Sequence, residues 1–395
     1  MQESTREVRR QRAVESLGVI DTDRNPRLDR ITRMARAIFG VPMSSVTVID
    51  SDRALFLGRD GFDVPVVGRA DTPCRLVIDS GEIITTDDAR IDPRFDDIAM
   101  FRANGLGFYL GHPLLDGSGN VVGSFCVMAP EPRQLNPLEM SEFVDLAAWA
   151  QSELLADAEA ASSRATQQAL LPDEPLEIDD VHVEGVCLPS LSVGGDYFDY
   201  GVVGRQVHVA VGDVMGKGVG AAILGAAVRA ACRAAVPTVT DGRRLGTAVD
   251  RIERAVLGDL QRTGSFVTYF HAVLDLDTDE LSYVDAGSGL SLIIRADGTI
   301  EQLMGADLPL GLEAQSHETH TTPLLTGDRL VVMSDGVLDI LDDDLDWVRE
   351  IGRIVARSGD GERTDGPDLV DAISMLADDR IARDDVTLLV LDRRP

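Results

Sequence analysis

Residues 193–222, VGGDYFDYGVVGRQVHVAVGDVMGKGVGAA, decide the fold of the second half of the chain. They place Asp196 in a Gly-Gly-Asp turn and Asp213 in a Gly-Asp turn, and the alternating valines of 207–211 predict a strand with one buried face. The neighbouring glycines let backbone and oxygen ligands approach closely. Two carboxylates held by one hairpin suit a hard divalent cation. Each aspartate taken alone is equally explained as an ordinary turn residue.

Two further stretches place aspartates at the ends of apolar strands. Residues 329–336, RLVVMSDG, predict a strand that ends in Asp335-Gly336, and residues 383–391, RDDVTLLVL, begin a terminal strand with Asp384 and Asp385. Four acidic sites at strand ends are more than turn chemistry requires. The sequence therefore favours a shared function for these carboxylates.

The order and spacing of these stretches resemble the PPM-type metal-dependent protein phosphatases over roughly residues 167–395. The bacterial branch typified by sporulation protein SpoIIE and the stress regulator RsbU is the closer match. The matching pieces are LLP at 170–172, VGGDYFD at 193–199, GDVMGKG at 212–218, LPLGL at 308–312, TGDRLVVMSDGV at 326–337 and DDVTLLVL at 384–391. The resemblance implies a β-sandwich flanked by helices, an α/β-sandwich phosphatase domain expected over residues 173–395.

The resemblance also implies a ligand set for two divalent cations, Mn²⁺ or Mg²⁺. Asp213 would bridge the two ions, Asp335 and Asp384 would join it on the first, and Asp196 and the main-chain carbonyl of Val214 would serve the second. Ligation by oxygen alone fits Mg²⁺ or Mn²⁺ better than zinc, which prefers His and Cys. Two such ions lower the pKa of a water and orient it toward a phosphoryl group. The four aspartates are therefore the expected catalytic residues.

Other residues of the matching pieces have less certain roles. Asp199 and Asp385 are candidates for orienting metal-bound waters, and Asp385 could instead be the direct ligand in place of Asp384. Lys217, between Gly216 and Gly218, is either a phosphate contact or a solvated lysine in a glycine-rich turn, and the two glycines could absorb a switching motion. The chain departs from many relatives at Ser288, where they carry His, and at Asp339, where they carry Glu.

The first half of the chain predicts a separate α+β domain over residues 20–150. Residues 1–27 are polar and charged, and a helix, a hairpin, a helix, a strand and a second hairpin follow, which indicates an antiparallel sheet with helices. With DARIDPRF at 88–95, GFYLGHPLL at 107–115 and VVGSFCVMAPEPRQL at 121–135, this domain resembles a GAF sensor domain. That resemblance names an architecture and leaves the ligand unknown.

Residues 137–171 predict a linker helix that also joins two copies of the chain. Small and apolar residues recur at alternating spacings of three and four, which is a heptad seam. We expect a homodimer, and the alternative is a solvated helix in a monomer. The seam consists of Met140, Val144, Ala147, Gln151, Leu154, Ala158, Ala161, Ala165 and Gln168.

The amino-acid composition and charge disfavour some classes of partner and function. The formal net charge of −30, from 67 acidic and 37 basic residues, disfavours nucleic acid and anionic membrane surfaces as partners. No run of about 20 apolar residues and no signal peptide is evident, so a cytoplasmic location is expected. The resemblance implies hydrolysis of phosphoserine or phosphothreonine on a signalling protein, an anti-sigma-factor antagonist, under control of the GAF domain. The alternative is a catalytically inactive signalling module of the same fold, and the charge disfavours a phosphodiesterase or nuclease.

Overall fold

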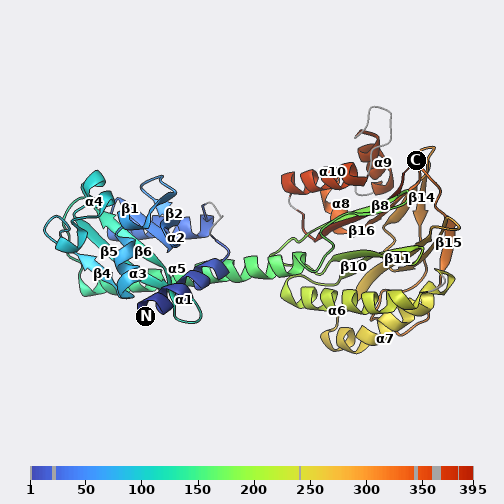
Figure 1. Cartoon of the computed structure of the whole chain (residues 1–395), viewed down its shortest axis with the longest axis horizontal. Helices are drawn as coiled ribbons and strands as arrows, with labels where there is room; N and C mark the ends of the chain where they lie inside the picture. Colours follow the sequence, from blue (N-terminus) through green and yellow to red (C-terminus); the bar gives the residue numbers. More distant parts are fainter. Residues whose placement is uncertain are drawn as a thin grey trace. The chain divides into compact units, whose positions relative to one another are not determined.

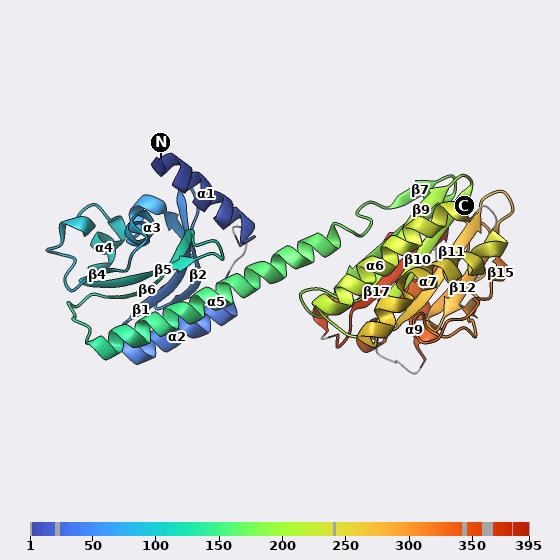
Figure 2. The ribbon, with the colours of Figure 1, turned by 90° about the horizontal axis from the view of Figure 1, so that it is seen from below.

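The structure is a computed structural model that describes residues 2–19, 24–239, 242–341, 346–357, 366–380 and 382–394. The chain divides into two compact units, Met1–Ser162 and Ser163–Pro395 (Figure 1). Each unit has its own strands and helices, as Figure 2 also shows, and its own hydrophobic core. No helix of the described segments is long and apolar enough to cross a membrane.

The first unit is one antiparallel sheet in the order β3-β2-β1-β6-β5-β4, with helices packed on both faces. Helices α1, α2 and α5 close one face, and α3 and α4 lie over the other. This arrangement matches the predicted α+β domain. The strands are β1 (Met43–Ile49), β2 (Arg53–Asp60), β3 (Val66–Gly68), β4 (Ile84–Thr86), β5 (Phe108–Leu115) and β6 (Val121–Ala129). The helices are α1 (Gln2–Ser16), α2 (Pro26–Phe39), α3 (Cys74–Ser80), α4 (Ala99–Asn104) and α5 (Pro137–Gln168).

Helix α1 was not predicted from the polar N-terminal sequence. It buries Val14 completely and is followed by the buried Leu17, while most of its other residues are charged or polar. Arg10 joins it to the sheet because its guanidinium donates hydrogen bonds to the carbonyls of Ile49 and Asp50. Two buried apolar residues are too few to produce a recognisable helical period.

Helix α5 uses much of its predicted dimer seam within the chain. Ala147, Leu154 and Ala158 are buried with Phe143 and Leu146 in the core of the first unit. The seam residues that follow Ala158 are exposed. The apolar period of this helix therefore reflects packing on the GAF-like sheet over residues 137–158.

The second unit is a sandwich of two antiparallel sheets with helices on both outer faces (Figure 1). One sheet has the order β15-β12-β11-β10-β9 and the other β14-β13-β16-β17-β8-β7. Apolar residues of both sheets meet in a central core. Helices α6 and α7 pack on the first sheet, and α8, α9 and α10 on the second. This is the sandwich flanked by helices that the sequence predicted.

Three strands, β10, β16 and β17, lie on the apolar stretches that predicted them. The strands are β7 (Leu176–Ile178), β8 (Val181–Leu188), β9 (Tyr197–Val203), β10 (Gln206–Val214), β11 (Val267–Asp275), β12 (Glu280–Ala286), β13 (Ser291–Ile294), β14 (Ile300–Leu303), β15 (His320–Pro323), β16 (Arg329–Met333) and β17 (Val386–Arg393). The helices are α6 (Val219–Ala235), α7 (Leu245–Thr263), α8 (Gly336–Ile340), α9 (Trp347–Arg357) and α10 (Gly366–Asp379).

Strand pairing brings the four predicted acidic sites to one edge of the sandwich. In the β9–β10 hairpin Gly212 pairs with Tyr197, so Asp196 and Asp213 lie at the same open end. In the other sheet Met333 pairs with Leu388, so the end of β16 adjoins the start of β17. Asp335 follows β16 and Asp384 precedes β17.

Candidate metal and phosphoryl-transfer site

The turn that carries Asp196 is held in place by Asp385. The buried carboxylate of Asp385 accepts hydrogen bonds from the backbone N–H groups of Ser190, at 2.8 Å, and Gly195, at 2.7 Å. A side chain at Gly194 would collide with that carboxylate, so the Gly-Gly sequence is needed for this close approach. Asp385 therefore positions the Asp196 turn, and the orientation of metal-bound water that the sequence suggested for it stays a prediction.

Asp196 is a buried carboxylate, and one of its two oxygens lacks a hydrogen-bond partner. Its side chain is 2% exposed, and its Oδ2 atom has no hydrogen-bond partner. Burial, and after it the neighbouring carboxylate of Asp213, raise the pKa of Asp196 well above its ordinary value. A buried carboxylate oxygen of this kind needs a cation or a proton to compensate its lost hydration.

Asp213, Asp335 and Asp384 form one electrostatic group with Asp196. Burial, and after it the charge of Asp335, raise the pKa of Asp213 to about 6, and Asp384 and Asp385 act in the same direction. Burial, and then the charge of Asp384, raise the pKa of Asp335. The structure therefore brings together the four aspartates that the sequence selected.

The main-chain carbonyl of Val214 also lies at this site. A Cβ atom added to Gly195 would stand 2.7 Å from the Val214 oxygen, so this carbonyl faces the turn that leads into Asp196. Gly216 and Gly218 follow with φ angles of 107° and 75°. Because residues with side chains rarely adopt such angles, these glycines let the chain leave β10 and enter α6.

Lys217 contacts a carboxylate in this structure. Its ammonium nitrogen lies 3.1 Å from Oδ2 of Asp384 and donates a hydrogen bond to the carbonyl of Arg383. Lys217 is the only lysine of the chain, whose other basic residues are arginines. The side chain is therefore not fully solvated, and the phosphate contact that the sequence also suggested stays a prediction.

Two residues that the sequence did not select shape the same site. The carboxylate of Asp339 in α8 accepts hydrogen bonds from the backbone N–H groups of Arg383, at 2.8 Å, and Asp384, at 3.2 Å. Ser334 accepts from the N–H of Thr387 and donates to the carbonyl of Asp385, both at 3.0 Å. Asp339 and Ser334 thus fix the start of β17. Their positions beside Asp335 in the chain were the available signal.

Asp199 lies apart from the carboxylate group. Its side chain points to α6, where it accepts hydrogen bonds from Arg233 at 2.6 and 2.9 Å and pairs with Arg229 at 3.4 Å. Asp199 lies on β9, three residues after Asp196 in the chain, and its carboxylate is paired with these two arginines. The structure therefore gives Asp199 a role in joining β9 to α6, and nothing directs it toward metal-bound water.

The donor set fits divalent cations, although the side chains do not converge into a finished site. In the described part of the chain no three His, Cys, Asp or Glu side chains are arranged to hold a metal ion. The unpartnered oxygen of buried Asp196 and the mutual repulsion of the carboxylates nevertheless mark a place for positive charge. Carboxylate and carbonyl oxygens are the donors that Mg²⁺ and Mn²⁺ prefer.

Comparisons with known proteins agree with this fold. Residues 204–394 match the family model described as Stage II sporulation protein E (SpoIIE), and residues 23–154 match that of the GAF domain. Among solved structures, the SiaA-PP2C domain of Pseudomonas aeruginosa has a TM-score of 0.51 at 21% identity and covers 62% of this chain and 99% of that chain. This last similarity concerns the fold alone.

Two curated relatives are similar over parts of the chain. Phosphoserine phosphatase RsbU of Bacillus subtilis (strain 168) is 25% identical over 191 residues, which are 48% of this chain and 55% of RsbU. Cyclic di-GMP phosphodiesterase PA2567 of Pseudomonas aeruginosa is 30% identical over 125 residues, which are 31% of this chain and 21% of that protein. The chain thus spans about half or less of the length of these relatives.

The family models thus assign residues 204–394 to a SpoIIE-type domain, which has the fold of a PP2C domain. They assign residues 23–154, in the first unit, to a GAF domain.

Proposed function

We propose that the second unit hydrolyses phosphoserine or phosphothreonine on a signalling protein and requires divalent cations to do so. The observation that carries this proposal is the position of Asp196, Asp213, Asp335 and Asp384. They lie at one edge of a two-sheet sandwich, each at the end of a strand. Rigid strands hold these carboxylates, and rigid placement of ligands is what phosphoryl transfer requires.

The ligand roles are those that the resemblance implies, and the contacts of Asp385 and Asp339 support them. Asp213 with Asp335 and Asp384 would hold one cation, and Asp213 with Asp196 and the carbonyl of Val214 a second. Bound divalent cations of this kind supply an activated water and neutralise phosphoryl oxygens. Asp385 fixes the Asp196 turn, and Asp339 fixes the chain at Asp384.

The surroundings of the site favour a protein as substrate. Four apolar side chains are exposed near the turn that follows Asp213, and solvent-exposed apolar groups of this size are typical of protein-binding surfaces. They are Leu191, Met215, Val219 and Ile223. With the resemblance to RsbU, this surface supports a phosphorylated anti-sigma-factor antagonist as the substrate class.

A second candidate function is a signalling module without catalysis. The ion pair of Lys217 with Asp384 favours it, because the lysine takes a carboxylate that a cation would need. In such a module the second unit would bind its partner without turnover. The two candidates differ in one measurable property, which is metal-dependent turnover.

The test compares hydrolysis of p-nitrophenyl phosphate, bis-p-nitrophenyl phosphate and a phosphorylated anti-sigma-factor antagonist, each with Mn²⁺ and with EDTA. A phosphatase of this type cleaves the monoester and the phosphoprotein with Mn²⁺ and loses both activities in EDTA. Binding of the phosphoprotein without turnover in Mn²⁺ or Mg²⁺ would exclude the phosphatase and support the catalytically inactive signalling module. Faster cleavage of the diester would contradict both candidates.

We further propose that the GAF domain controls the site through the end of α5. The side-chain amide of Gln167 donates to the carbonyl of Gly194 at 2.7 Å and accepts from its N–H at 3.0 Å. Arg164, one turn earlier, donates to the carbonyls of Ser192 and Leu191. These contacts hold the loop that leads into Asp196, so a rotation of α5 would move that loop.

A further inference from the structure

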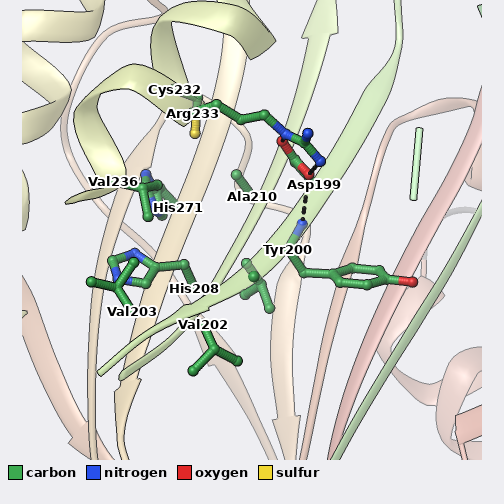
Figure 3. A pocket seen from close by; sticks show the side chains of 12 residues that line it. Asp199, Tyr200, Val202, Val203, His208, Ala210, Cys232, Arg233, Val236 and His271 are labelled. Atoms are coloured by element: carbon green, nitrogen blue, oxygen red, sulfur yellow. Dashed lines mark hydrogen bonds and ion pairs between the residues drawn. The ribbon is translucent and has the colours of Figure 1, made fainter. Parts of the chain in front are cut away.

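A cavity of about 240 Å³ lies on the helix-facing side of β9, β10 and β11, beside the end of α6 (Figure 3). Gly201, Val203 and Ala210 line it from the sheet, and Val236 lines it after the helix. The four predicted metal-binding aspartates are absent from its lining. Nothing in the proposed phosphatase reaction uses this space.

Two buried imidazoles bring unpartnered polar atoms to this otherwise apolar lining. His208 is 2% exposed, and neither of its ring nitrogens has a hydrogen-bond partner. His271 is fully buried, and its Nε2 atom has no partner. Their ring centroids are 5.8 Å apart, and Figure 3 shows both rings on the same side of the pocket as Val203 and Val236. Buried polar groups are rarely left without a partner.

The hydrogen bonds of Tyr269 with Cys232 and His271 bear on whether Nε2 of His271 donates or accepts a hydrogen bond from a ligand. The hydroxyl of Tyr269 donates to Sγ of Cys232 at 3.1 Å and lies 3.0 Å from Nδ1 of His271. With the phenolic proton on sulfur, Nδ1 of His271 donates its proton to the Tyr269 oxygen. Nε2 of a neutral His271 is then an acceptor, and neutral His208 adds one donor and one acceptor.

The two charged residues that line the cavity, Asp199 and Arg233, pair with each other, so a ligand needs no charge of its own. The guanidinium of Arg233 is paired with the carboxylate of Asp199 at 2.6 and 2.9 Å, and Arg229 lies on the far side of that carboxylate. Burial lowers the pKa of His208 to about 4, and burial followed by the neighbouring His208 lowers that of His271 to about 3. Both rings are therefore neutral at pH 7.

We propose that this cavity is a binding site for an uncharged, planar compound of one or two fused rings with at least one N–H or O–H donor. The donor would bind Nε2 of His271 or the free nitrogen of His208, and the ring faces would contact Val203, Ala210 and Val236. A dry cavity of about 150 Å³ accommodates benzene, so the larger volume here suits a bicyclic ring system.

Helix α6 connects this site to the carboxylate group. Cys232 and Arg233, near the C-terminal end of α6, line the cavity. Two turns earlier, a Cβ atom added to Gly225 would stand 2.5 Å from the carbonyl oxygen of Gly195. The helix backbone thus touches the turn that carries Asp196. A ligand that displaces the end of α6 changes the support of this turn, so the site is an effector site.

The binding test uses the full-length protein with ¹³C-labelled histidine and indole as the probe. The chain has six histidines, so their ring signals can be assigned by single His→Gln variants. Indole should shift the signals of His208 and His271 saturably, with a dissociation constant on the order of 0.1–1 mM for a ligand of this size. Equal or absent shifts of all six signals would overturn the proposal.

Two comparisons make the test specific. A Cβ atom added to Gly201 meets no atom within 4 Å, and Gly201 pairs with His208, so Gly201→Val should fill the cavity and weaken indole binding more than tenfold without disturbing the strand. Gly117→Val, in an equally open position of the first unit, is the matched control and should leave binding unchanged. Indene, which has the shape of indole without its N–H, should bind several-fold more weakly, and equal binding would contradict the role of the histidines.

The effector role has its own readout in the affinity for Mn²⁺, measured by calorimetry with and without saturating indole. Coupling between the two sites is reciprocal, so indole should change the Mn²⁺ affinity several-fold in wild type and leave it unchanged in Gly201→Val. Unchanged affinity in wild type, with His208 and His271 shifted, would leave a binding site and remove the effector role. The shifts of the histidine signals do not depend on the proposed phosphatase activity. A failure of the binding proposal can therefore be distinguished from a failure of the proposed phosphatase function.

Discussion

Asp213 is the residue on which the proposed metal site depends most. It would be shared by both cations, and burial together with Asp335 already raises the pKa of Asp213 to about 6. We predict that Asp213→Asn lowers Mn²⁺-dependent phosphatase activity on the order of a thousandfold or more. In EDTA at pH 7 the same variant should melt a few degrees higher than wild type, because it removes one of several repelling carboxylates. Activity within a few-fold of wild type would refute the assignment.

Lys217 provides a second test at the residue scale. Because its ammonium group pairs with Asp384, it competes with a cation for that carboxylate. Lys217→Ala should lower the Mn²⁺ concentration for half-maximal activity several-fold and leave kcat nearly unchanged, whereas Lys217→Arg should resemble wild type. A raised KM for the phosphoprotein with an unchanged Mn²⁺ requirement would instead assign Lys217 to phosphate binding.

The buried histidines make the second unit sensitive to acid. His208 and His271 face Asp199, Arg233, Cys232 and Tyr269, and burial lowers their pKa values to about 4 and about 3 from an ordinary value of 6.5. Between pH 6.5 and pH 4 the unfolded chain therefore binds protons that the folded chain does not. The free energy of unfolding should fall in this range as pH falls, by up to about 1.4 kcal/mol per pH unit for each histidine.

His208→Gln should remove one of these two contributions to the pH dependence. Of the two tryptophans, Trp347 lies in the second unit, so its fluorescence in a Trp149→Phe background reports that unit alone. His112→Gln, in the first unit, is the control and should leave the slope of the second unit unchanged. An equal slope in His208→Gln and wild type would show that His208 is protonated in the folded state.

At the scale of elements, the end of α5 is the part that decides regulation. Gln167 makes two hydrogen bonds to Gly194, and the neighbouring Gln168 is exposed. Loss of both bonds should loosen the Asp196 turn, because each typically contributes about 1 kcal/mol. We predict that Gln167→Ala lowers kcat roughly tenfold and weakens Mn²⁺ binding, since small misplacements of reacting groups are costly.

Gln168→Ala is the matched control and should retain wild-type kcat and Mn²⁺ affinity. Equal behaviour of the two variants would mean that α5 is only a tether. A Gln167→Ala enzyme that no longer differs between full-length protein and a chain of residues 137–395 would support transmission from the GAF domain through this residue. A difference that persists would require another route.

At the scale of the whole molecule, the open question is how two copies would meet. The predicted seam of α5 is buried within the first unit at Leu154 and Ala158, but Ala161 and Ala165 are exposed. We predict a dimer at micromolar concentration by light scattering, joined through this later part of the seam. Ala161→Glu combined with Ala165→Glu should produce monomers with an unchanged melting temperature, because like charges would face each other.

Ala156→Glu, on an exposed position of α5 outside the seam, should remain dimeric. A charged residue at Leu154 would be misleading, since it would damage the core of the GAF domain whether or not a dimer forms. A wild-type monomer at micromolar concentration would refute the dimer prediction.

The sequence by itself determined the parts of this protein that depend on local patterns. The alternating valines predicted β10, and the strand-end aspartates were selected before their proximity was known. Periodicity and turn chemistry act over a few neighbouring residues, so one sequence suffices to recognise them. Helix α1 was not predicted, because tertiary contacts stabilise it and its own sequence has no clear apolar period.

Tertiary structure alone decided the partners of the polar side chains. Asp385 contacts Gly195 from 190 residues away, Lys217 reaches Asp384, and Asp199 turns to Arg233 although it stands beside Asp196 in the chain. The cavity at His208 and His271 likewise exists only because β10, β11 and the end of α6 meet. A side chain's hydrogen bonds and desolvation depend on what surrounds it in space, and the order of residues does not state that.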